Sequence, residues 1–540
     1  MRRLAVLLAA ALLGAGASVH ADEPVNRLAA AIPSTPAHPR NSEGAFVTLK
    51  SGRILFVYSQ FQEGTSDFSP CRLAQLHSDD GGRTWSDPVA LFTPAPGTME
   101  MSVSLLRLAS GKLALFSAIK HGTLDCRPYL RISTDEGVTW SAPRSLIDAP
   151  GYVVLNNDRI IQTRAGRLIM PLAFHRGLKS VDDGVHEPAP VDLRGIALWY
   201  YSDDEGATWK ESETWWTLPG AGFTRTGLQE PGVVELADGS LFSWARTDRG
   251  SQFGFRSTDG GVTWTAPEPL ALPSPASPAT IKRVPGSADL LAIYNDRSGL
   301  APFRTDRSTW SGRSPLVAAL SSDGGVTWRP AKILEEDTAR DYTYIALHFE
   351  REAALVGYIA YYAAQPLAST HPIRRLDLAW LTAPDDALTA RARRETRAIL
   401  AADETWVKIH AAEALIGGGE AAAIRREFLE LSATASARPY RVGIWRVLAN
   451  TAPTAALRAE AIGEVAKIFL TPGVPDRSQA LETLAKLRAP LDGALLDEVR
   501  RTAAGSGSLA ALARWALRGA GAPDSLEPFV ALFASADPVE

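Results

Sequence analysis

The sequence predicts an all-β six-bladed β-propeller over residues 22–383, followed by an all-α helical-repeat domain over residues 384–540. Three observations predict this division. An eight-residue motif recurs five times, strand hairpins with glycine turns precede its copies, and both patterns stop before a region rich in Ala, Leu, Arg and Glu. At 540 residues the chain is too long for one compact domain. Eleven of the 14 tryptophans precede residue 381, so the two regions follow different rules.

The first 21 residues have the pattern of a secretory signal peptide. Arg2 and Arg3 precede an apolar run over residues 4–17, and Val19-His20-Ala21 is a small-x-small cleavage site. The apolar run is short for a membrane span, although an uncleaved anchor is the alternative. No later segment has about 18 uninterrupted apolar residues. We therefore expect a periplasmic or secreted protein with no membrane span after signal cleavage.

The recurring motif reads S-x-D-x-G-x-T-W and predicts a structured turn between two strands. Its copies start 55, 69, 55 and 64 residues apart, which is the spacing of one repeated supersecondary unit. The Asp is expected to cap its own loop, the Gly to take a positive φ, and the Trp to pack between neighbouring units. The five copies are Ser78–Trp85, Ser133–Trp140, Ser202–Trp209, Ser257–Trp264 and Ser321–Trp328. The motif resembles the Asp-box, or BNR repeat, of sialidases and other β-propellers.

Strand patterns around the motif predict six blades. A short strand runs into each copy, and upstream lie six hairpins. The sixth hairpin has no motif, and residues 374–381 are expected to supply its third strand. The residues before Arg40 are expected to complete the last blade, which would remove exposed sheet edges. The hairpins join residues 45–50 to 53–59, 103–108 to 112–118, 159–163 to 167–174, 233–237 to 240–246, 279–284 to 289–295, and 344–349 to 353–361.

From about Pro384 the spacing of apolar residues becomes helical. Gly and Pro interrupt the pattern every 12–18 residues or so, which is typical of stacked helical pairs similar to HEAT repeats. No catalytic set of residues is visible in this region. It either binds a protein partner or packs on the propeller, and the sequence does not decide between them.

Composition excludes several classes of partner and cofactor. The formal net charge is −4, so there is no excess positive charge to neutralise nucleic acid phosphates. Two cysteines rule out a disulfide scaffold and a Cys-rich zinc site. Cys71 and Cys126 either pair or stay as free buried thiols. No His/Cys/Asp cluster has metal-ligand spacing, so we expect neither a metal nor another cofactor.

Polar residues concentrate at the loops that should share one rim of the propeller. In an up-and-down blade, the start of the first strand, the end of the second and the start of the third lie at one rim, and the motifs lie at the other. Each residue has a structural alternative, such as a surface ion pair for an arginine or a turn cap for an aspartate. The candidates are Arg40, Asp67, Asn157, Asp158, Arg159, His175, Glu230, Arg246, Arg313, Tyr342 and Tyr344.

This set of residue types favours a sugar that carries a carboxylate at its anomeric carbon. Converging arginines suit a carboxylate, because the planar guanidinium makes two parallel hydrogen bonds to it. A carboxylate nucleophile would be repelled by such a substrate, whereas a neutral tyrosine activated by a glutamate would not. A separate aspartate can protonate the leaving group.

Residues 37–381 resemble the sialidase superfamily, in particular its bacterial BNR-repeat branch. That family uses an arginine triad, a Tyr/Glu pair and an Asp acid/base. The resemblance assigns the second arginine and the glutamate to Arg246 and Glu230, which lies in Glu230-Pro231. Arg313, eight residues before the last motif, resembles the third arginine, and Asp67, eleven residues before the first, resembles the acid/base.

Two assignments are less direct. Arg40 has the place of the first arginine, although the family's Arg-Ile-Pro is replaced by Arg40-Asn41-Ser42. The tyrosine is Tyr344 or Tyr342, with Tyr344 favoured, and their equal parity puts both on one face of the strand. Asn157, Arg159 and His175 would shape the pocket, or would have a structural role.

The sequence therefore predicts an exo-α-sialidase-like retaining glycoside hydrolase whose substrate is a sialylated or other acidic glycan. The arginines would hold the carboxylate, the tyrosine would attack with Glu230 as its base, and Asp67 would protonate the leaving oxygen. One alternative is another glycosidase, or a lyase, that acts on uronate glycans; a lyase would leave unsaturated products that absorb in the ultraviolet. The other alternative is a non-catalytic glycan-binding propeller, since Asp-boxes also occur in non-enzymes.

Overall fold

The computed structural model describes residues 25–92, 99–122, 124–177, 192–219, 223–299, 312–362, 365–384 and 386–519. The predicted signal peptide over residues 1–21 lies outside these ranges. The chain divides into two compact units, residues 1–385 and 386–540. The first unit is rich in β-sheet and the second is helical, as the sequence predicts.

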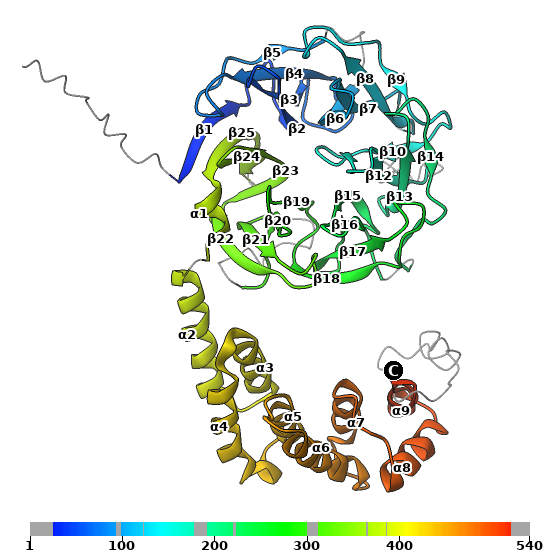
Figure 1. Cartoon of the computed structure of the whole chain (residues 1–540), viewed down its shortest axis with the longest axis vertical. Coiled ribbons are helices and arrows are strands. Elements are labelled where there is room, and N and C mark those ends of the chain that lie inside the picture. Colours follow the sequence, from blue (N-terminus) through cyan, green and yellow to red (C-terminus); the bar gives the residue numbers. More distant parts are fainter. Residues whose placement is uncertain are drawn as a thin grey trace, which may run out of the picture. The chain divides into compact units, whose positions relative to one another are not determined.

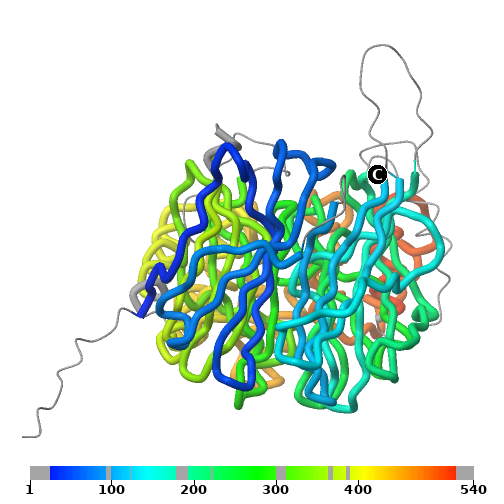
Figure 2. Tube along the Cα trace, turned by 90° about the horizontal axis from the view of Figure 1, so that it is seen from above, coloured from blue at the N-terminus to red at the C-terminus, as the bar shows by residue number. Residues whose placement is uncertain are grey.

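In the first unit, successive antiparallel sheets follow one another around a common centre (Figure 1). Figure 2 shows their long strands running side by side. The strands are β1 (Asn26–Pro33), β2 (Asn41–Thr48), β3 (Ile54–Phe61), β4 (Cys71–Ser78), β5 (Val89–Ala90), β6 (Met99–Arg107), β7 (Leu113–Lys120), β8 (Cys126–Ser133), β9 (Arg144–Ser145), β10 (Tyr152–Val154), β11 (Ile161–Gln162), β12 (Leu168–His175), β13 (Ile196–Ser202), β14 (Lys210–Glu211), β15 (Gln229–Glu235), β16 (Leu241–Arg246), β17 (Ser251–Ser257), β18 (Glu268–Pro273), β19 (Thr280–Arg283), β20 (Leu290–Asn295), β21 (Leu316–Ser321), β22 (Arg329–Glu335), β23 (Arg340–Glu350), β24 (Ala353–Tyr362) and β25 (Gln365–Asp377).

The strands pair mostly with their neighbours in sequence. β15 to β18 form one four-stranded sheet and β19 to β22 another. Strands β2 to β14 form a longer sheet, in which single parallel pairs, Cys71 with Met99 and Cys126 with Tyr152, connect successive antiparallel groups. β1 pairs with β25 and so completes the sheet of β23, β24 and β25. This confirms the prediction that residues before Arg40 complete the last sheet of the unit.

Two predicted strands differ from the observed ones. β25 ends at Asp377, and residues 378–381 belong to the short helix α1 (Leu378–Thr382) and not to a strand. The Asp377 side chain accepts a hydrogen bond from the backbone N–H of Trp380, which is the N-cap arrangement that starts a helix. The strand predicted over residues 159–163 is reduced to β11, and β10 lies upstream of it.

The five motif copies form the predicted turns, each at the end of the third strand of a hairpin group. In the first copy, the Asp80 carboxylate accepts hydrogen bonds from the backbone N–H groups of Arg83 and Thr84 and from the Thr84 hydroxyl. Gly82 has φ +86°, and a Cβ there would lie 2.5 Å from Leu355 Cδ2 on the neighbouring sheet. The motif is therefore satisfied by its own loop.

The motif tryptophans pack against the preceding group of strands, as predicted. Trp209 meets Phe116 of β7 edge-on, with ring centroids 6.2 Å apart. Trp264 stacks on Trp199 of β13 at 4.5 Å. Burial of these large rings between groups stabilises the succession of sheets.

The second unit is built from helices around one continuous apolar core. Consecutive helices pack against each other, and N-cap threonines, such as Thr405 and Thr454, accept hydrogen bonds from the first turns of α3 and α6. None of the described helices is both long and apolar enough to cross a membrane. The helices are α2 (Asp386–Ala402), α3 (Trp406–Leu415), α4 (Ala421–Ser432), α5 (Arg441–Asn450), α6 (Ala455–Leu470), α7 (Arg477–Lys486), α8 (Gly493–Ala503) and α9 (Ser508–Gly519).

Candidate active site

The innermost strands of several sheets carry a β-bulge at a corresponding position. The pairing register shifts around Glu43 in β2, around Ser102 in β6, around Glu230 in β15 and around Tyr344 in β23. Ser102, Glu230 and Tyr344 have φ values of +61°, +50° and +55°. A bulge re-aims a side chain relative to its strand, and all four of these residues line one cavity.

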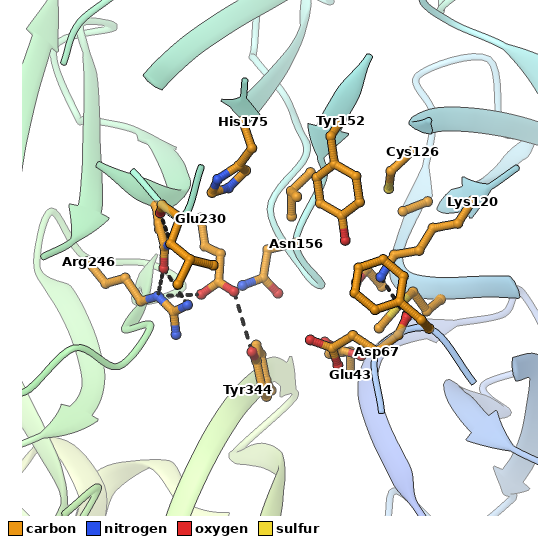
Figure 3. Close-up of a pocket in the computed structure, with 17 residues that line it drawn as sticks. Glu43, Asp67, Lys120, Cys126, Tyr152, Asn156, His175, Glu230, Arg246 and Tyr344 are labelled. Carbon is orange, nitrogen blue, oxygen red and sulfur yellow. Dashed lines mark hydrogen bonds and ion pairs between the residues drawn. The ribbon is translucent and has the colours of Figure 1, made fainter. Parts of the chain in front are cut away.

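The cavity has a volume of about 310 Å³ and a charged wall (Figure 3). An adjoining hollow of about 270 Å³ shares Asp67 and Tyr344 with it and is lined by Arg40 and Arg313. The charged residues of the first cavity are Glu43, Asp67, Lys120, Glu230 and Arg246.

Tyr344 and Glu230 form the centre of the site. The Tyr344 hydroxyl lies 3.4 Å from Glu230 Oε1, and Arg246 Nε lies 3.1 Å from Glu230 Oε2. Burial and the nearby Glu230 raise the pKa of the Tyr344 hydroxyl above its ordinary value of 10.0. The hydroxyl is therefore a neutral phenol at neutral pH, and it needs a base such as Glu230 to become a nucleophile.

Tyr342 does not share this position, so the prediction that both tyrosines lie on one face of the strand is wrong. The bulge after Thr343 breaks the alternation of side chains along β23. Tyr342 is 1% exposed, meets Tyr358 edge-on and directs its hydroxyl at the backbone oxygen of Asp337. Of the two tyrosines, only Tyr344 lines the cavity.

The three predicted arginines lie around Tyr344, and two of them retain unused donors. Arg246 binds Gln229 and Glu230, yet its Nη1 is buried without a partner among the described residues. Arg313 donates to Thr343 Oγ1 at 2.8 Å and to a backbone oxygen, and no described residue pairs with its Nε. Unpaired buried donors are costly, so they favour an anionic ligand at this place.

Arg40 and Asp67 form an ion pair at the mouth of the site. Arg40 Nη1 lies 2.5 Å from Asp67 Oδ1, and the Asp67 side chain is 55% exposed. The Lys120 ammonium donates to the backbone oxygen of Asp67 at 2.7 Å. Its partial burial alone would raise the pKa of Asp67, but the charges of Arg40 and Lys120 hold the pKa below its ordinary value of 3.8.

Glu43 lies beside this ion pair and is almost fully buried. Its side chain is 5% exposed, Oε1 is 3.9 Å from Arg40 Nη2, and Oε2 has no hydrogen-bond partner among the described residues. Burial raises the pKa of Glu43 from 4.5 to about 7, against the opposing effect of Arg40. The surroundings of Glu43 therefore favour the protonated form of its carboxyl group.

The sheet-rich unit matches the model of a known protein family. The model of the BNR repeat-like domain matches residues 74–356, which is more than half of the chain. The chain belongs to this BNR repeat-like family. The match includes the last residues of β4 and continues to β24, so it contains all five motif copies.

Two curated relatives of this BNR-repeat chain are sialidases. A sialidase of Bacteroides fragilis (strain YCH46) is 27% identical over 335 residues, covering 56% of this chain and 56% of the relative. A sialidase of Micromonospora viridifaciens is 27% identical over 343 residues, covering 56% of this chain and 47% of the relative. The chain therefore spans about half the length of the curated relatives it matches.

A solved structure supports the same fold. The NanB sialidase of Streptococcus pneumoniae, in complex with 2-[(3-chlorobenzyl)ammonio]ethanesulfonate, aligns with a TM-score of 0.50 at 15% sequence identity. The alignment covers 66% of this chain and 71% of that chain. The sheet-rich unit thus has the sialidase-like β-propeller fold.

The BNR-repeat unit brings most of the predicted site residues together, but not all of them. Tyr344, Glu230, Asp67, Arg246 and His175 line the first cavity, and Arg40 and Arg313 line the adjoining hollow. His175 is the last residue of β12; its Nδ1 lies 2.8 Å from the backbone oxygen of Asp192, and burial lowers its pKa. The predicted strand starts at residue 233, after Glu230, and this start is wrong. β15 begins at Gln229 and includes the bulge, so Glu230 lies within the strand.

Asn157 and Arg159 do not reach the cavity wall. The amide nitrogen of Asn157 donates to the backbone oxygen of Gly44, which fixes the loop to β2. Arg159 is 2% exposed and donates to the hydroxyl of Thr280. The prediction that Asn157 and Arg159 shape the pocket is therefore wrong. Both side chains are buried and hydrogen-bond to residues of other strands.

Glu43 and Lys120 were not among the predicted site residues. Lys120 is the last residue of β7, just as His175 ends β12 and Arg246 ends β16, so the rule that found those two also applies to it. Glu43 has no comparable signal, because a bulge does not follow from the residue pattern of one strand. Cys71 and Cys126, whose pairing the sequence left open, are both free and buried.

Proposed function

We propose that this chain is an exo-α-sialidase-like retaining glycoside hydrolase on a six-bladed β-propeller, which removes a terminal sialic acid or a related 2-keto sugar acid. The observation that carries the proposal is the contact between Tyr344 and Glu230, in a cavity bordered by arginines with unused donors. The sialidase relatives support it.

The arginines would hold the substrate carboxylate. Arg246 approaches Tyr344 from the side of β16, and Arg40 and Arg313 border it from the adjoining hollow. A guanidinium group stays charged and offers a planar pair of donors to a carboxylate. Binding of the carboxylate would satisfy donors that are buried without partners in the free protein, such as Arg246 Nη1 and Arg313 Nε.

Tyr344 would attack the anomeric carbon. Glu230 would take the hydroxyl proton as the new bond forms, because its Oε1 is the neighbour of the hydroxyl. A neutral phenol avoids the repulsion that a carboxylate nucleophile would meet at a carbon that bears a carboxylate. Water would then attack the anomeric carbon from the face that the leaving group has vacated, opposite the tyrosine. The two successive inversions would release the sugar with retained configuration.

A carboxyl group across the cavity from Glu230 would protonate the leaving oxygen and later activate the water. Asp67 is the candidate that the sequence provides. Figure 3 shows Asp67 and Glu43 together on one side of Tyr344, with Glu230 and Arg246 on the other. The proton donor and the base of the nucleophile would therefore act from different sides of Tyr344.

A pair of tyrosine variants tests the proposal. Tyr344→Phe removes the nucleophile, and we expect kcat/KM for an aryl sialoside to fall by about 10³-fold or more. Tyr342→Phe removes the same hydroxyl two residues away, where it contacts only a backbone oxygen at 3.4 Å. This control should stay within about threefold of the wild type, because that contact is remote from the reacting atoms.

The measurement is release of free sialic acid from sialyllactose and of the phenol from the aryl sialoside. Pectic and ulvan oligosaccharides are incubated in parallel and followed in the ultraviolet. The proposal is wrong if the wild type releases no sialic acid, if Tyr344→Phe retains full activity, or if only the uronate glycans are cleaved.

The proposal extends to the first 21 residues and to the helical unit. Residues 1–21 would be a signal peptide that delivers the enzyme to the periplasm or the outside of the cell; the mass of the exported protein tests this. The helical unit would be a HEAT-like array, with a protein partner as its expected ligand. Its consecutive packed helices and single core support that reading.

A further inference from the structure

The cavity contains one carboxyl group that the proposed reaction has not used. Glu43 occupies the bulge of β2, which corresponds to the bulge of Glu230 in β15 and to that of Tyr344 in β23. A bulge at the corresponding position of each strand thus directs Glu230, Tyr344 and Glu43 into the cavity. Glu43 therefore has a position from which its side chain would contact a bound substrate.

Asp67 and Glu43 are adjacent but have different electrostatic surroundings. Asp67 is half-exposed and paired with Arg40 at 2.5 Å, and Lys120 adds a second positive charge. These contacts stabilise its carboxylate form. Glu43 is buried, none of the described residues hydrogen-bonds to its Oε2, and its Oε1 lies 3.9 Å from Arg40 Nη2. An acid catalyst must carry a proton before the reaction starts, and the surroundings of Glu43 favour that form.

The groups around Glu43 explain this preference. Arg40 is the positive charge whose attraction lowers its pKa, whereas burial and the negative charges of Asp67 and Glu230 raise it to about 7. The phenols of Tyr344 and Tyr152 and the thiol of Cys71 also lie within its electrostatic reach. Their own pKa values are raised by burial, so they contribute no charge at neutral pH.

We propose that Glu43, and not Asp67, is the proton donor and acceptor of this site, while Asp67 stays ionised and positions Arg40. This inference rests on the proposed sialidase function. As the bond from the anomeric carbon to the leaving oxygen breaks, the Glu43 proton passes to that oxygen and Glu43 becomes a carboxylate. In the second step Glu43 takes a proton from water, the hydroxide forms a bond to the anomeric carbon, and the bond to Tyr344 Oη breaks. Glu230 then returns the proton to Tyr344.

The chain departs from the sialidase pattern next to this residue. The motif Arg-Ile-Pro of the resemblance is Arg40-Asn41-Ser42 here, and Glu43 follows it directly. The Asn41 amide donates to the backbone oxygen of Pro33 and holds the start of β2 against the preceding segment. The change of motif and the inward carboxyl group thus occur in the same four residues.

Two matched amides test the assignment. Glu43→Gln and Asp67→Asn each replace a carboxyl group by an amide of nearly the same shape, so neither is expected to disturb folding. Each is assayed on sialyllactose, whose leaving alcohol needs a proton, and on a nitrophenyl sialoside, whose leaving phenolate does not. For Glu43→Gln we expect kcat/KM to fall by about 10²–10⁴-fold on sialyllactose and by far less on the aryl substrate.

Asp67→Asn should lower kcat/KM on both substrates by a similar factor, because it loosens Arg40 and leaves the proton donor in place. Azide needs no deprotonation, so it should restore turnover of the aryl substrate in Glu43→Gln but not in Asp67→Asn. The wild type should lose activity on sialyllactose as the pH rises through about 7, and Glu43→Gln should lose this alkaline limb.

The outcomes separate the two proposals. If the wild type cleaves sialosides and Glu43→Gln lowers kcat/KM for both substrates equally, the assignment of Glu43 is overturned and the sialidase function stands. The same holds if the leaving-group-dependent loss appears in Asp67→Asn. If the wild type cleaves no sialoside, the sialidase function and the role of Glu43 in it both fail. Infrared difference spectra provide a readout without substrate: a protonated carboxyl band at pH 6 that Glu43→Gln removes supports the assignment, and its absence overturns it.

Discussion

The Asp-box turns and the cavity use similar residues in opposite ways. In the first box, the Asp80 carboxylate accepts several hydrogen bonds from its own loop, and Ser78 Oγ accepts one from the backbone N–H of Gly82 at 2.9 Å. In the cavity, Glu43 Oε2 and Arg246 Nη1 are buried without partners in the described part of the chain. The carboxylate of the first box is thus satisfied by its own loop, whereas charged groups near the bulges of the inner strands keep unused hydrogen-bonding atoms.

This difference separates groups that stabilise the fold from groups that bind a ligand. Buried polar atoms without partners destabilise a free protein, so they persist where a ligand can complete them. A carboxylate that already accepts its hydrogen bonds from its own loop is not available to bind a ligand. We therefore expect changes at the cavity to lower activity and changes at the boxes to lower stability.

The largest difference in this comparison is expected between an arginine of the cavity and an arginine beside a box. Arg313→Lys keeps the charge but loses the planar fork, and we expect kcat/KM for sialyllactose to fall by about 10²- to 10³-fold. Arg53→Lys is the control: Arg53 makes a two-point ion pair with Asp79 of the first box, and both side chains are exposed. Exposed pairs contribute about 1 kcal/mol or less, so neither kcat/KM nor unfolding should change appreciably. Equal losses in both variants would contradict the comparison.

The two regions also differ in how far the sequence predicts them. The boxes are local: spacing and residue type alone predict the Asp cap and the packing of the Trp, as at Asp80 and Trp209. The cavity depends on bulges, and a bulge shifts every side chain that follows it to the other face of the strand. For this reason the prediction that Tyr342 and Tyr344 share one face, made from their spacing of two residues, is wrong.

Long-range burial explains the other differences from prediction. Asn157 and Arg159 read as rim residues, but contacts with Gly44 and Thr280, more than 100 residues away in the chain, place them behind the site. The raised pKa of Glu43 likewise arises from burial among residues of other sheets. No local pattern of residue types contains this information.

A glycine pair tests the box as a structural element. Gly82 and Gly52 both have φ +86°, but a Cβ at Gly82 would lie 2.5 Å from Leu355 Cδ2. A Cβ at Gly52 would have no atom of the described residues within 4 Å. Gly52→Ala should cost roughly 1 kcal/mol of unfolding free energy through backbone strain. Gly82→Ala adds the clash and should cost about 2–4 kcal/mol.

Urea unfolding followed by tryptophan fluorescence measures both glycine variants. The kcat of each folded variant should equal that of the wild type, since neither glycine lines the cavity. An equal loss of stability in the two variants would show that packing against Leu355 adds nothing to the box.

The smallest expected effect is the acid sensitivity of a box. Hydrogen bonds from Thr84, Ser78 and Arg83 lower the pKa of Asp80 from 3.8 to about 2, against the opposing effect of partial burial. The folded state therefore favours the carboxylate; this stabilisation is complete above about pH 5 and is lost as the pH falls towards 2.

Asp80→Asn removes this titration. The difference in unfolding free energy between wild type and variant should therefore be constant from about pH 5 to 7 and should shrink between pH 4 and 2. Urea unfolding at a series of pH values measures it, and Asp323→Asn, in the equivalent box with the pKa of its Asp also near 2, should behave alike. A difference that does not depend on pH would mean that the boxes are held by shape and neutral hydrogen bonds, and that the charge of Asp80 contributes nothing to the stability of the turn.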